Sequence, residues 1–255
     1  MVLTDTHTHL YYEKDGVKRA GLMKRCLENN VERLFLPNVD SESIELVMGL
    51  ANEYPQYCFP MLGLHPCDVK DGFEKELDLI YNAISQYKIY AVGEIGIDLY
   101  WDKSTLEIQR KAFKMQIDWA KSLGLPIVIH SRDSFDEVYE ILVENKDERL
   151  RGIFHCFSGN LEQANKIINL GFYLGIGGVV TYKNSGLDKV VSEVDMKHLV
   201  LETDSPYLTP APFRGKPNES SYLTYIAAKI AELKNTNIAE IAKITTENSK
   251  DIFNI

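Results

Sequence analysis

Eight short runs of apolar and β-branched residues recur along the chain, separated by longer stretches with helical spacing. The runs lie at residues 2–6, 33–38, 58–64, 90–96, 126–131, 152–158, 172–178 and 198–204. Alternation of strands and helices favours parallel pairing of the strands, with the helices packed outside them. Eight such units in 255 residues predict an α/β fold, a (β/α)8 TIM barrel that forms a single domain over residues 1–255.

Two of the intervening stretches show how their helices begin or end. Residues 107–124 carry apolar residues at helical spacing and end in Gly124, and glycine is common just beyond a helix. Residues 160–171 begin with Asn160, a preferred N-cap residue. After a proline-containing loop at 203–221, two further helical patterns close the chain, at about 220–233 and 238–253.

The composition excludes some functions and leaves others open. A net charge of −9 argues against a protein that coats long duplexes with a broad basic face, but not against an enzyme that holds one phosphate group at a time. None of the four cysteines forms a CxxC pair, so we expect reduced thiols. We find no signal peptide and no apolar run of about 18 residues, and we expect a cytoplasmic monomer without membrane contact.

Polar side chains gather where the predicted strands end. In a barrel the carboxyl ends of the strands form one rim, which carries the chemistry of the fold. Five of the six histidines and three carboxylates fall at such ends: His7, His9, His65, Glu94, His130, His155, Glu202 and Asp204. Each residue alone also fits a hydrogen-bonded core histidine or a salt bridge. Their joint placement at one rim favours a shared site instead.

The spacing of these residues indicates bound cations. Residues two apart on a strand point to the same side, about 7 Å apart, so the imidazoles of His7 and His9 can converge on one ion. Glu202 and Asp204 share this spacing, and without a cation two buried carboxylates would repel each other. Glu94 lies in the apolar run VGEIGID, where an unpaired carboxylate is costly.

The candidate ligands form a mixed set of nitrogen and oxygen donors: His7, His9, Glu94, His130, His155 and Asp204. Such a set suits Zn, Mn or Fe, and Mg in its oxygen-rich part. Six ligands are too many for a single catalytic ion, because that ion needs an open position. We therefore predict two divalent metal ions that share a bridging carboxylate, and Glu94 on the middle strand is the natural bridge.

Several motifs carry a resemblance to a known family. They are DTHTHL, GLHP, VGEIGIDLYWDKS, QRKAFKMQIDWAKSLGLPIVIHSRDS, FHCFSG and LETDSPYLTPAPFRGKPNES, between residues 5 and 220. With these motifs in this order, the chain resembles the TatD-type metal-dependent deoxyribonucleases of the amidohydrolase superfamily. The resemblance implies a (β/α)8 barrel with two or three divalent metals that hydrolyses DNA phosphodiester bonds, often from the 3′ end.

The resemblance also implies roles for single residues. Glu94 bridges the two metals, and the other ligands divide into a first-metal set, His7, His9 and Asp204, and a second-metal set, His130 and His155. His65 and Arg214 resemble the phosphate-binding residues of the family, and Glu202 is a candidate ligand of a third metal. Asp5 lies outside the implied metal set, and we expect it to support an imidazole ring.

A mechanism follows from this set as a hypothesis. A water held between two metal ions loses a proton near neutral pH and attacks phosphorus as hydroxide. Asp204, beside the first metal, orients that water or accepts its proton, so Asp204 and Glu94 are the predicted catalytic residues. The metals, His65 and Arg214 stabilise the charge that develops on the phosphoryl oxygens.

The sequence leaves part of the substrate open. We expect a 3′–5′ exonuclease on DNA, single-stranded or at 3′ ends; RNA and the ester of an aminoacylated nucleic acid are further candidates. Alternatives are an amidohydrolase-type enzyme for a small ester, amide or phosphotriester, and a metal-binding barrel without catalysis. Many amidohydrolase-type barrels bridge their metals with a carboxylated lysine after the fourth strand, where this chain has Glu94. Tyr100 and Trp101, which follow that strand, either stack a base or pack against the fold.

Overall fold

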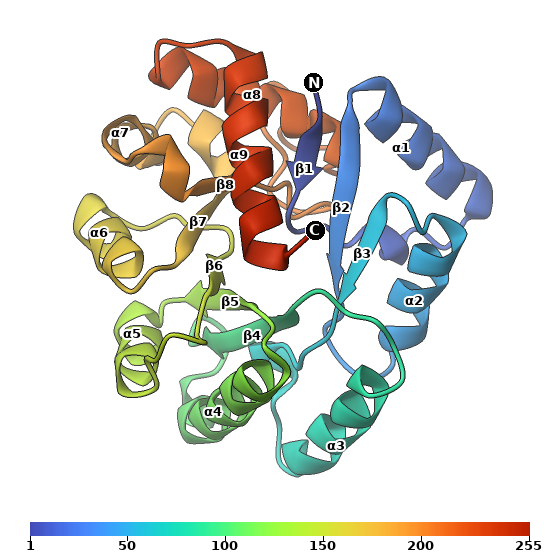
Figure 1. The fold of residues 1–255 in the computed structure, drawn as a ribbon, viewed down its shortest axis with the longest axis vertical. Coiled ribbons are helices and arrows are strands. Elements are labelled where there is room, and N and C mark those ends of the chain that lie inside the picture. The colour runs from blue at the N-terminus through green and yellow to red at the C-terminus, as the bar shows by residue number, and fades with distance from the viewer.

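The protein folds into eight parallel strands surrounded by helices, in a computed structural model that describes residues 1–255 (Figure 1). The strands are β1 (Leu3–Asp5), β2 (Val31–Pro37), β3 (Cys58–Met61), β4 (Val92–Asp98), β5 (Ile127–Arg132), β6 (Gly152–Phe154), β7 (Tyr173–Ile176) and β8 (Leu199–Leu201). The helices are α1 (Gly16–Glu28), α2 (Ile44–Glu53), α3 (Phe73–Ile84), α4 (Leu106–Leu123), α5 (Phe135–Glu144), α6 (Leu161–Asn169), α7 (Leu187–Glu193), α8 (Leu223–Leu233) and α9 (Ile238–Phe253). The predicted α/β barrel is confirmed.

Backbone hydrogen bonds join the strands into a ring. Strands β1 to β3 form one parallel sheet and β4 to β8 form another. The two sheets meet at two seams. At the seam between β1 and β8, the N–H of Thr6 donates to the carbonyl of Leu201 at 2.9 Å. At the seam between β3 and β4, the N–H of Gly93 donates to the carbonyl of Leu62 at 3.0 Å. The first and last strands therefore lie side by side, and so do the residues that follow them.

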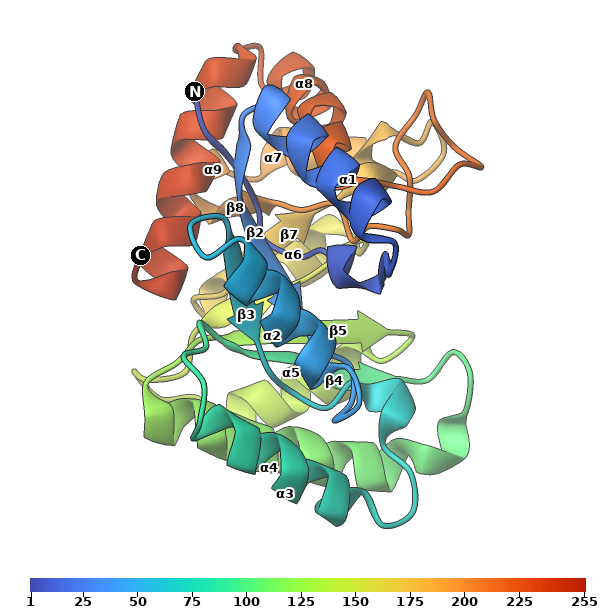
Figure 2. The same cartoon turned by 90° about the vertical axis from the view of Figure 1, so that its right-hand side faces the viewer.

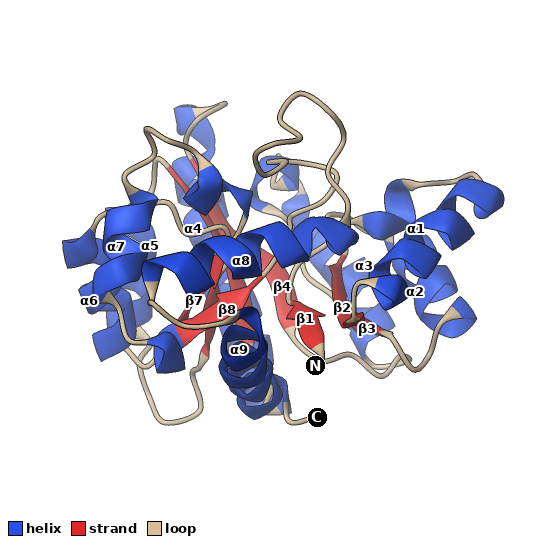
Figure 3. Cartoon of the chain, turned by 90° about the horizontal axis from the view of Figure 1, so that it is seen from above, coloured by secondary structure: helices blue, strands red, loops and turns tan.

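Helix α9 closes the end of the barrel where the strands begin. Ile252 and Phe253 pack in one buried cluster with strand residues that include Phe35 and Val128, and the rings of Phe35 and Phe253 stack with centroids 3.7 Å apart. Figure 2 shows α9 at the left and the loops after β4 and β8 projecting at the right. Seen from above, the helices flank the strands, and loops rise at the edge opposite α9 (Figure 3). The polar rim is thus the open end.

Several strands end before the residues that the sequence predicts. Strands β3, β6, β7 and β8 stop short of residues 64, 158, 178 and 204. The reason is local backbone geometry after β6 and β8, because Cys156 and Asp204 have positive φ angles of 49° and 55°, which strands do not contain. The chain turns at these points, and His155 and Asp204 lie on turns above the sheet rather than within it.

Strand β4 runs further than predicted, to Asp98 instead of residue 96. Gly96 makes this possible, because a Cβ atom added there would lie 2.0 Å from the carbonyl oxygen of His130. Only glycine permits so close an approach of β4 to β5. The extension keeps Glu94 and Asp98 on one strand beside His130.

The predicted helix ends are largely confirmed. Asn160 caps α6 by accepting the N–H of Gln163, whose side chain accepts the N–H of Asn160 in return. Helix α4 ends at Gly124, which has a left-handed φ of 67°. Among all the helices, none is both long and apolar enough to cross a membrane.

Candidate metal centre

Glu94 lies on β4 at the centre of the rim, with 2% of its surface exposed. Its two carboxylate oxygens face different imidazoles. Oε2 lies 3.1 Å from His7 Nε2, whereas Oε1 lies 2.8 Å from His155 Nε2 and 2.7 Å from His130 Nδ1. One buried carboxylate therefore lies between two sets of candidate ligands, which is the position that a bridge requires.

We call His7, His9 and Asp204 the inner group. The Nε2 atoms of His7 and His9 lie 3.3 Å apart, and Asp204 Oδ1 lies 3.5 Å from His9 Nε2 and 3.8 Å from His7 Nε2. Two facing imidazole nitrogens cannot both donate, so they either share one proton or direct both lone pairs at a common cation.

The seam between β1 and β8 positions the inner group. The backbone N–H of Asp204 donates to the carbonyl of His7 at 2.9 Å. Behind this contact, the Asp5 carboxylate accepts the backbone N–H of His7 at 3.3 Å and the hydroxyl of Thr203 at 2.6 Å. Asp5 therefore holds the backbone that carries the ligands, and the expectation that it supports an imidazole ring is wrong.

Tyr11, which is not among the predicted site residues, prepares His9 to bind a cation. The Tyr11 hydroxyl donates to the carbonyl of Pro37 at 2.7 Å and lies 2.9 Å from His9 Nδ1. Because its only hydrogen is used for Pro37, the Tyr11 oxygen accepts from Nδ1–H of His9. The lone pair of a neutral His9 is then on Nε2, which faces Asp204.

We call His65, His130 and His155 the outer group. Nε2 of His65 lies 3.4 Å from Glu94 Oε1, so all three rings approach the same oxygen. The exposed fractions of their side chains are 15%, 16% and 5%, against 0% for His7, 5% for His9 and 13% for Asp204. The outer group is the more open of the two.

Asp98 orients His130 and was missed in the sequence. Asp98 Oδ2 lies 2.8 Å from His130 Nε2, while Nδ1 of the same ring faces Glu94. Burial raises the pKa of Asp98, but the hydrogen bond with His130 outweighs it, and the pKa lies below its usual value. The ionised carboxylate accepts Nε2–H, which leaves Nδ1 of a neutral ring as the ligand atom.

His65 is held in the opposite tautomer. Its Nδ1 accepts the backbone N–H of Cys67 at 3.1 Å, so the proton of a neutral ring is on Nε2. That atom points at the rim as a donor, whereas a metal ligand there would need its lone pair. The arrangement suits a group that donates to an oxygen, as expected for a phosphate-binding residue.

The charges of the cluster depend on one another. Burial favours the neutral form of Glu94, yet the imidazoles around it, His155 foremost, hold its pKa well below the usual range. Burial also disfavours a charged His155, but Glu94 and Glu202 raise the pKa of its ring well above the usual range. A cation that binds here must therefore displace protons from the imidazoles, so its affinity falls in acid.

Glu202, the predicted candidate for a third metal, lies at the far edge of the His155 ring from Glu94. Its Oε1 is 3.6 Å from His155 Nδ1 and accepts the backbone N–H of Cys156, while Oε2 is buried without a hydrogen-bond partner. With His155 and Cys156 it forms a further cluster of possible ligands. Its role as a ligand stays a prediction.

Arg214 lies apart from both groups. It is exposed on the loop after β8, and its guanidinium carbon lies 4.1 Å from the centroid of the Tyr182 ring. It forms no ion pair with any carboxylate of the cluster. The structure therefore brings together every predicted metal ligand and His65, but not Arg214.

The donor atoms are spaced as a metal site requires. Two ligands bound at 2.0–2.1 Å to a tetrahedral ion lie about 3.3 Å apart. The inner group and Glu94 approach this spacing, with 3.3 Å between His7 and His9 and 3.1 Å between His7 and Glu94. The groups His7–His9–Glu94 and His7–His155–Asp204 each place their ligand atoms within 4.8 Å of one another. Imidazoles with carboxylates are a donor set for divalent transition metals, so the residues fit such ions.

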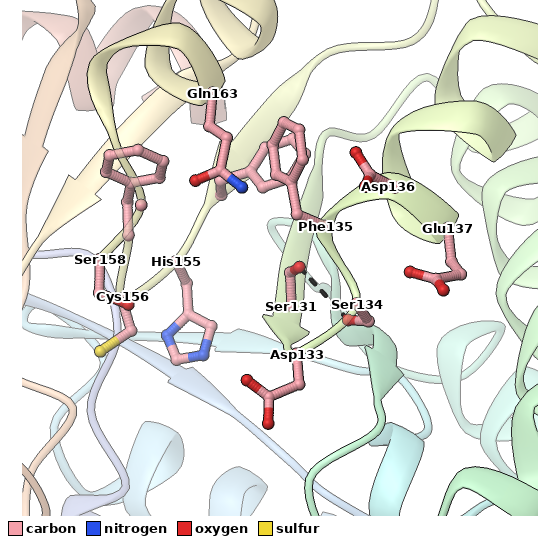
Figure 4. Close-up of a pocket in the computed structure, with 13 residues that line it drawn as sticks. Ser131, Asp133, Ser134, Phe135, Asp136, Glu137, His155, Cys156, Ser158 and Gln163 are labelled. Carbon is pink, nitrogen blue, oxygen red and sulfur yellow. Dashed lines mark hydrogen bonds between the residues drawn. The ribbon is translucent and has the colours of Figure 1, made fainter.

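A pocket of about 420 Å³ opens beside His155 (Figure 4). Much of its lining consists of carboxylates and hydroxyls, from Ser131, Asp133, Ser134, Asp136, Glu137 and Ser158. No lysine or arginine lines it. Figure 4 marks the hydrogen bond between the hydroxyls of Ser131 and Ser134, whose oxygens lie 3.4 Å apart. Such a lining suits the neutral polar groups of a substrate rather than its phosphates.

Comparisons with known proteins show the family to which the chain belongs. Residues 4–254 match the model of the family described as TatD related DNase. The chain is 43% identical to the uncharacterized metal-dependent hydrolase YabD of Bacillus subtilis over the full length of both. It is 29% identical to the 3′-5′ ssDNA/RNA exonuclease TatD of Pectobacterium parmentieri, over 97% of this chain and 96% of that protein.

The crystal structure of YjjV, a TatD homolog from Escherichia coli, superposes with a TM-score of 0.93 at 30% identity. The match covers 99% of this chain and 98% of that one. The family model spans all of the residues that carry the motifs and the histidine–carboxylate cluster. The chain therefore belongs to the TatD related DNase family of metal-dependent hydrolases.

Proposed function

We propose that this protein is a deoxyribonuclease that hydrolyses phosphodiester bonds of single-stranded DNA from the 3′ end, with two divalent ions. The observation that carries the proposal is the position of Glu94, whose two oxygens face the inner and the outer group separately. The name of the Pectobacterium parmentieri relative, an exonuclease for single-stranded DNA and RNA, supports the substrate class.

Different residues would bind each of the two ions. His7, His9 and Asp204 would hold one ion, His130 and His155 the other, and Glu94 both. When bound, two such ions lower the pKa of a shared water toward about 7 and offset the charge of the phosphoryl group.

Asp204 is the proposed general base. Burial raises the pKa of its carboxyl, but His9 and the other nearby imidazoles outweigh that effect and hold the pKa below its usual value. The side chain is therefore ionised at neutral pH. An ionised carboxylate in this position can orient the attacking water and accept its proton.

His65 and Arg214 are the proposed phosphate contacts. His65 presents Nε2–H at the rim because Cys67 occupies Nδ1, and a neutral donor can hydrogen-bond a phosphoryl oxygen without binding a metal. The guanidinium carbon of Arg214 lies 4.1 Å from the centroid of Tyr182, and a guanidinium group can pair two phosphoryl oxygens.

The test is hydrolysis of a 5′-labelled single-stranded DNA by protein stripped of metal and then supplied with Mg, Mn or Zn. We expect no product in EDTA and a ladder that shortens from the 3′ end with metal. Glu94→Gln is the matched control and should give no ladder. Degradation without metal, or no degradation with any metal, contradicts the proposal. Hydrolysis of small amides, lactones or phosphotriesters alone would favour the amidohydrolase-type alternative.

A further inference from the structure

The loop after β4 exposes two aromatic side chains at the open rim. Trp101 is 73% exposed and is the most exposed aromatic residue of the protein, and Tyr100 is 52% exposed. An exposed aromatic ring offers a flat apolar face that a partner can cover. In Figure 2 this loop projects beyond the strands on the same side as the loop after β8.

The two rings and Arg132 form one ordered unit. The Tyr100 and Trp101 rings stand perpendicular, with centroids 4.8 Å apart. The guanidinium carbon of Arg132 lies 3.6 Å from the centroid of Tyr100 and 5.7 Å from that of Trp101. Arg132 therefore covers Tyr100, whereas Trp101 keeps most of its surface free for a flat partner.

Hydrogen bonds tie this unit to the outer group. The backbone N–H of Tyr100 donates to Asp98 Oδ1 at 3.0 Å, and Asp98 Oδ2 lies 2.8 Å from His130 Nε2. Arg132 follows His130 by two residues on β5. The backbone that carries the aromatic rings is thus hydrogen-bonded to Asp98, which contacts the candidate metal ligand His130.

A cation lies beside the two aromatic rings. Arg132, within 3.6 Å of the Tyr100 centroid and 5.7 Å of the Trp101 centroid, forms no ion pair with a carboxylate. Free cations beside an exposed aromatic face are the pattern that binds single-stranded nucleic acid, because the cations contact phosphates while bases stack.

We propose that Trp101, supported by Tyr100 and Arg132, is a stacking subsite for a nucleobase of a single-stranded substrate. The subsite rests on the proposed nuclease function and adds to it a reason for strand preference. A base inside a duplex has both faces covered by its neighbours, so stacking on Trp101 favours an unpaired base or a terminal base over one inside a duplex.

Binding of a nuclease-resistant substrate tests the subsite. We would measure fluorescence anisotropy of a labelled phosphorothioate single-stranded DNA with the metal-loaded protein, and of the same strand with abasic residues near its 3′ end. The variants are Trp101→Ala, Trp101→Phe and, as a matched control, Tyr81→Ala, since Tyr81 is 42% exposed on α3. Hydrolysis of bis(p-nitrophenyl) phosphate, which has no base, reports whether the metal centre of each variant is intact.

We expect Trp101→Ala to weaken binding of the intact strand by about 5- to 150-fold, Trp101→Phe to weaken it less, and Tyr81→Ala to leave it unchanged. Abasic residues should weaken binding to the wild type but not further to Trp101→Ala. Equal affinities of wild type and Trp101→Ala, or equal losses on the abasic strand, would overturn the subsite even if DNA is hydrolysed. If unmodified DNA is not hydrolysed but binding depends on Trp101, the nuclease function fails and the subsite stands.

Discussion

The inner and the outer group contact the same carboxylate, yet the protein holds them in different ways. The inner group comes from the two ends of the chain, after β1 and β8, and a backbone hydrogen bond joins His7 to Asp204. The outer group comes from the middle of the chain. There, a single side chain, Asp98, orients His130, and a turn N–H orients His65.

This difference indicates separate origins for the stability of the two sites. Closure of the barrel builds the inner group, so any correctly folded molecule has it. The outer group depends on individual side-chain contacts and lies nearer to solvent and to the pocket at His155. We therefore expect an inner ion that exchanges slowly and an outer ion that is lost first.

Glu94→Gln should have the largest effect, because it removes the negative charge that both groups share. We expect activity to fall by roughly 10³-fold or more and the metal content to drop, measured by elemental analysis beside the rate on DNA. Circular dichroism should show an intact fold. A variant that keeps both metals and its activity would remove Glu94 as the bridge.

Asp204→Asn separates the two groups. The amide cannot accept a proton from water, so kcat should fall by about 10²- to 10⁴-fold, while the outer ion stays bound. Steady-state kinetics and metal analysis of the same sample check both parts. Simultaneous loss of the outer ion would show that the two sites are not independently built.

Asp98→Asn should act on the outer group alone. The amide no longer fixes the proton of His130 on Nε2, and loss of such a support typically lowers metal affinity by about 10- to 100-fold. Competition with a chelator measures the affinities of the two ions separately. Equal weakening of both would contradict the contrast drawn between the groups.

Glu219→Gln should have the smallest effect and concerns the loop that follows Asp204. Glu219 Oε2 lies 2.6 Å from Arg25 Nη2 on α1, and these charges, with Ser221, hold the pKa of Glu219 below its usual value against the effect of burial. Because the pKa of Glu219 is lower in the folded protein than in the unfolded chain, its ionised form stabilises the fold at pH values above the ordinary pKa. This stabilisation is lost as the pH falls through the lowered pKa of the folded protein.

We expect Glu219→Gln to lower the free energy of unfolding at pH 7 by about 1 kcal/mol or less. The difference from the wild type should shrink as the pH falls below the ordinary pKa of a glutamate, about 4.3, and vanish only below the lowered pKa of Glu219. Urea unfolding at several pH values measures it. A difference that persists in acid would show that the ion pair is not its source.

Much of the fold and site could be predicted from the sequence because strand ends meet at one rim. The position of Glu94 in an apolar run and the spacing of His7 and His9 sufficed to place them together. Asp98 was missed, although a signal existed: it lies four residues after Glu94 in the same run, and a period of two puts both on one side.

Other features depend on geometry that no local pattern encodes. The contact of Tyr11 with His9 follows from a short 3₁₀ turn at Leu10–Tyr12, and the early ends of β6 and β8 follow from single residues with positive φ. The tautomer of His65 depends on the backbone N–H of Cys67. Tertiary contacts determine each of these local conformations and protonation states.

The central claim, that Glu94 lies between two bound cations, is most directly tested by anomalous X-ray diffraction from crystals of the protein loaded with Mn or Zn. We predict two anomalous peaks about 3.5–4 Å apart, one beside the inner group and one beside the outer group, each next to a different oxygen of Glu94. A single peak, or two peaks of which one does not contact Glu94, would contradict the claim.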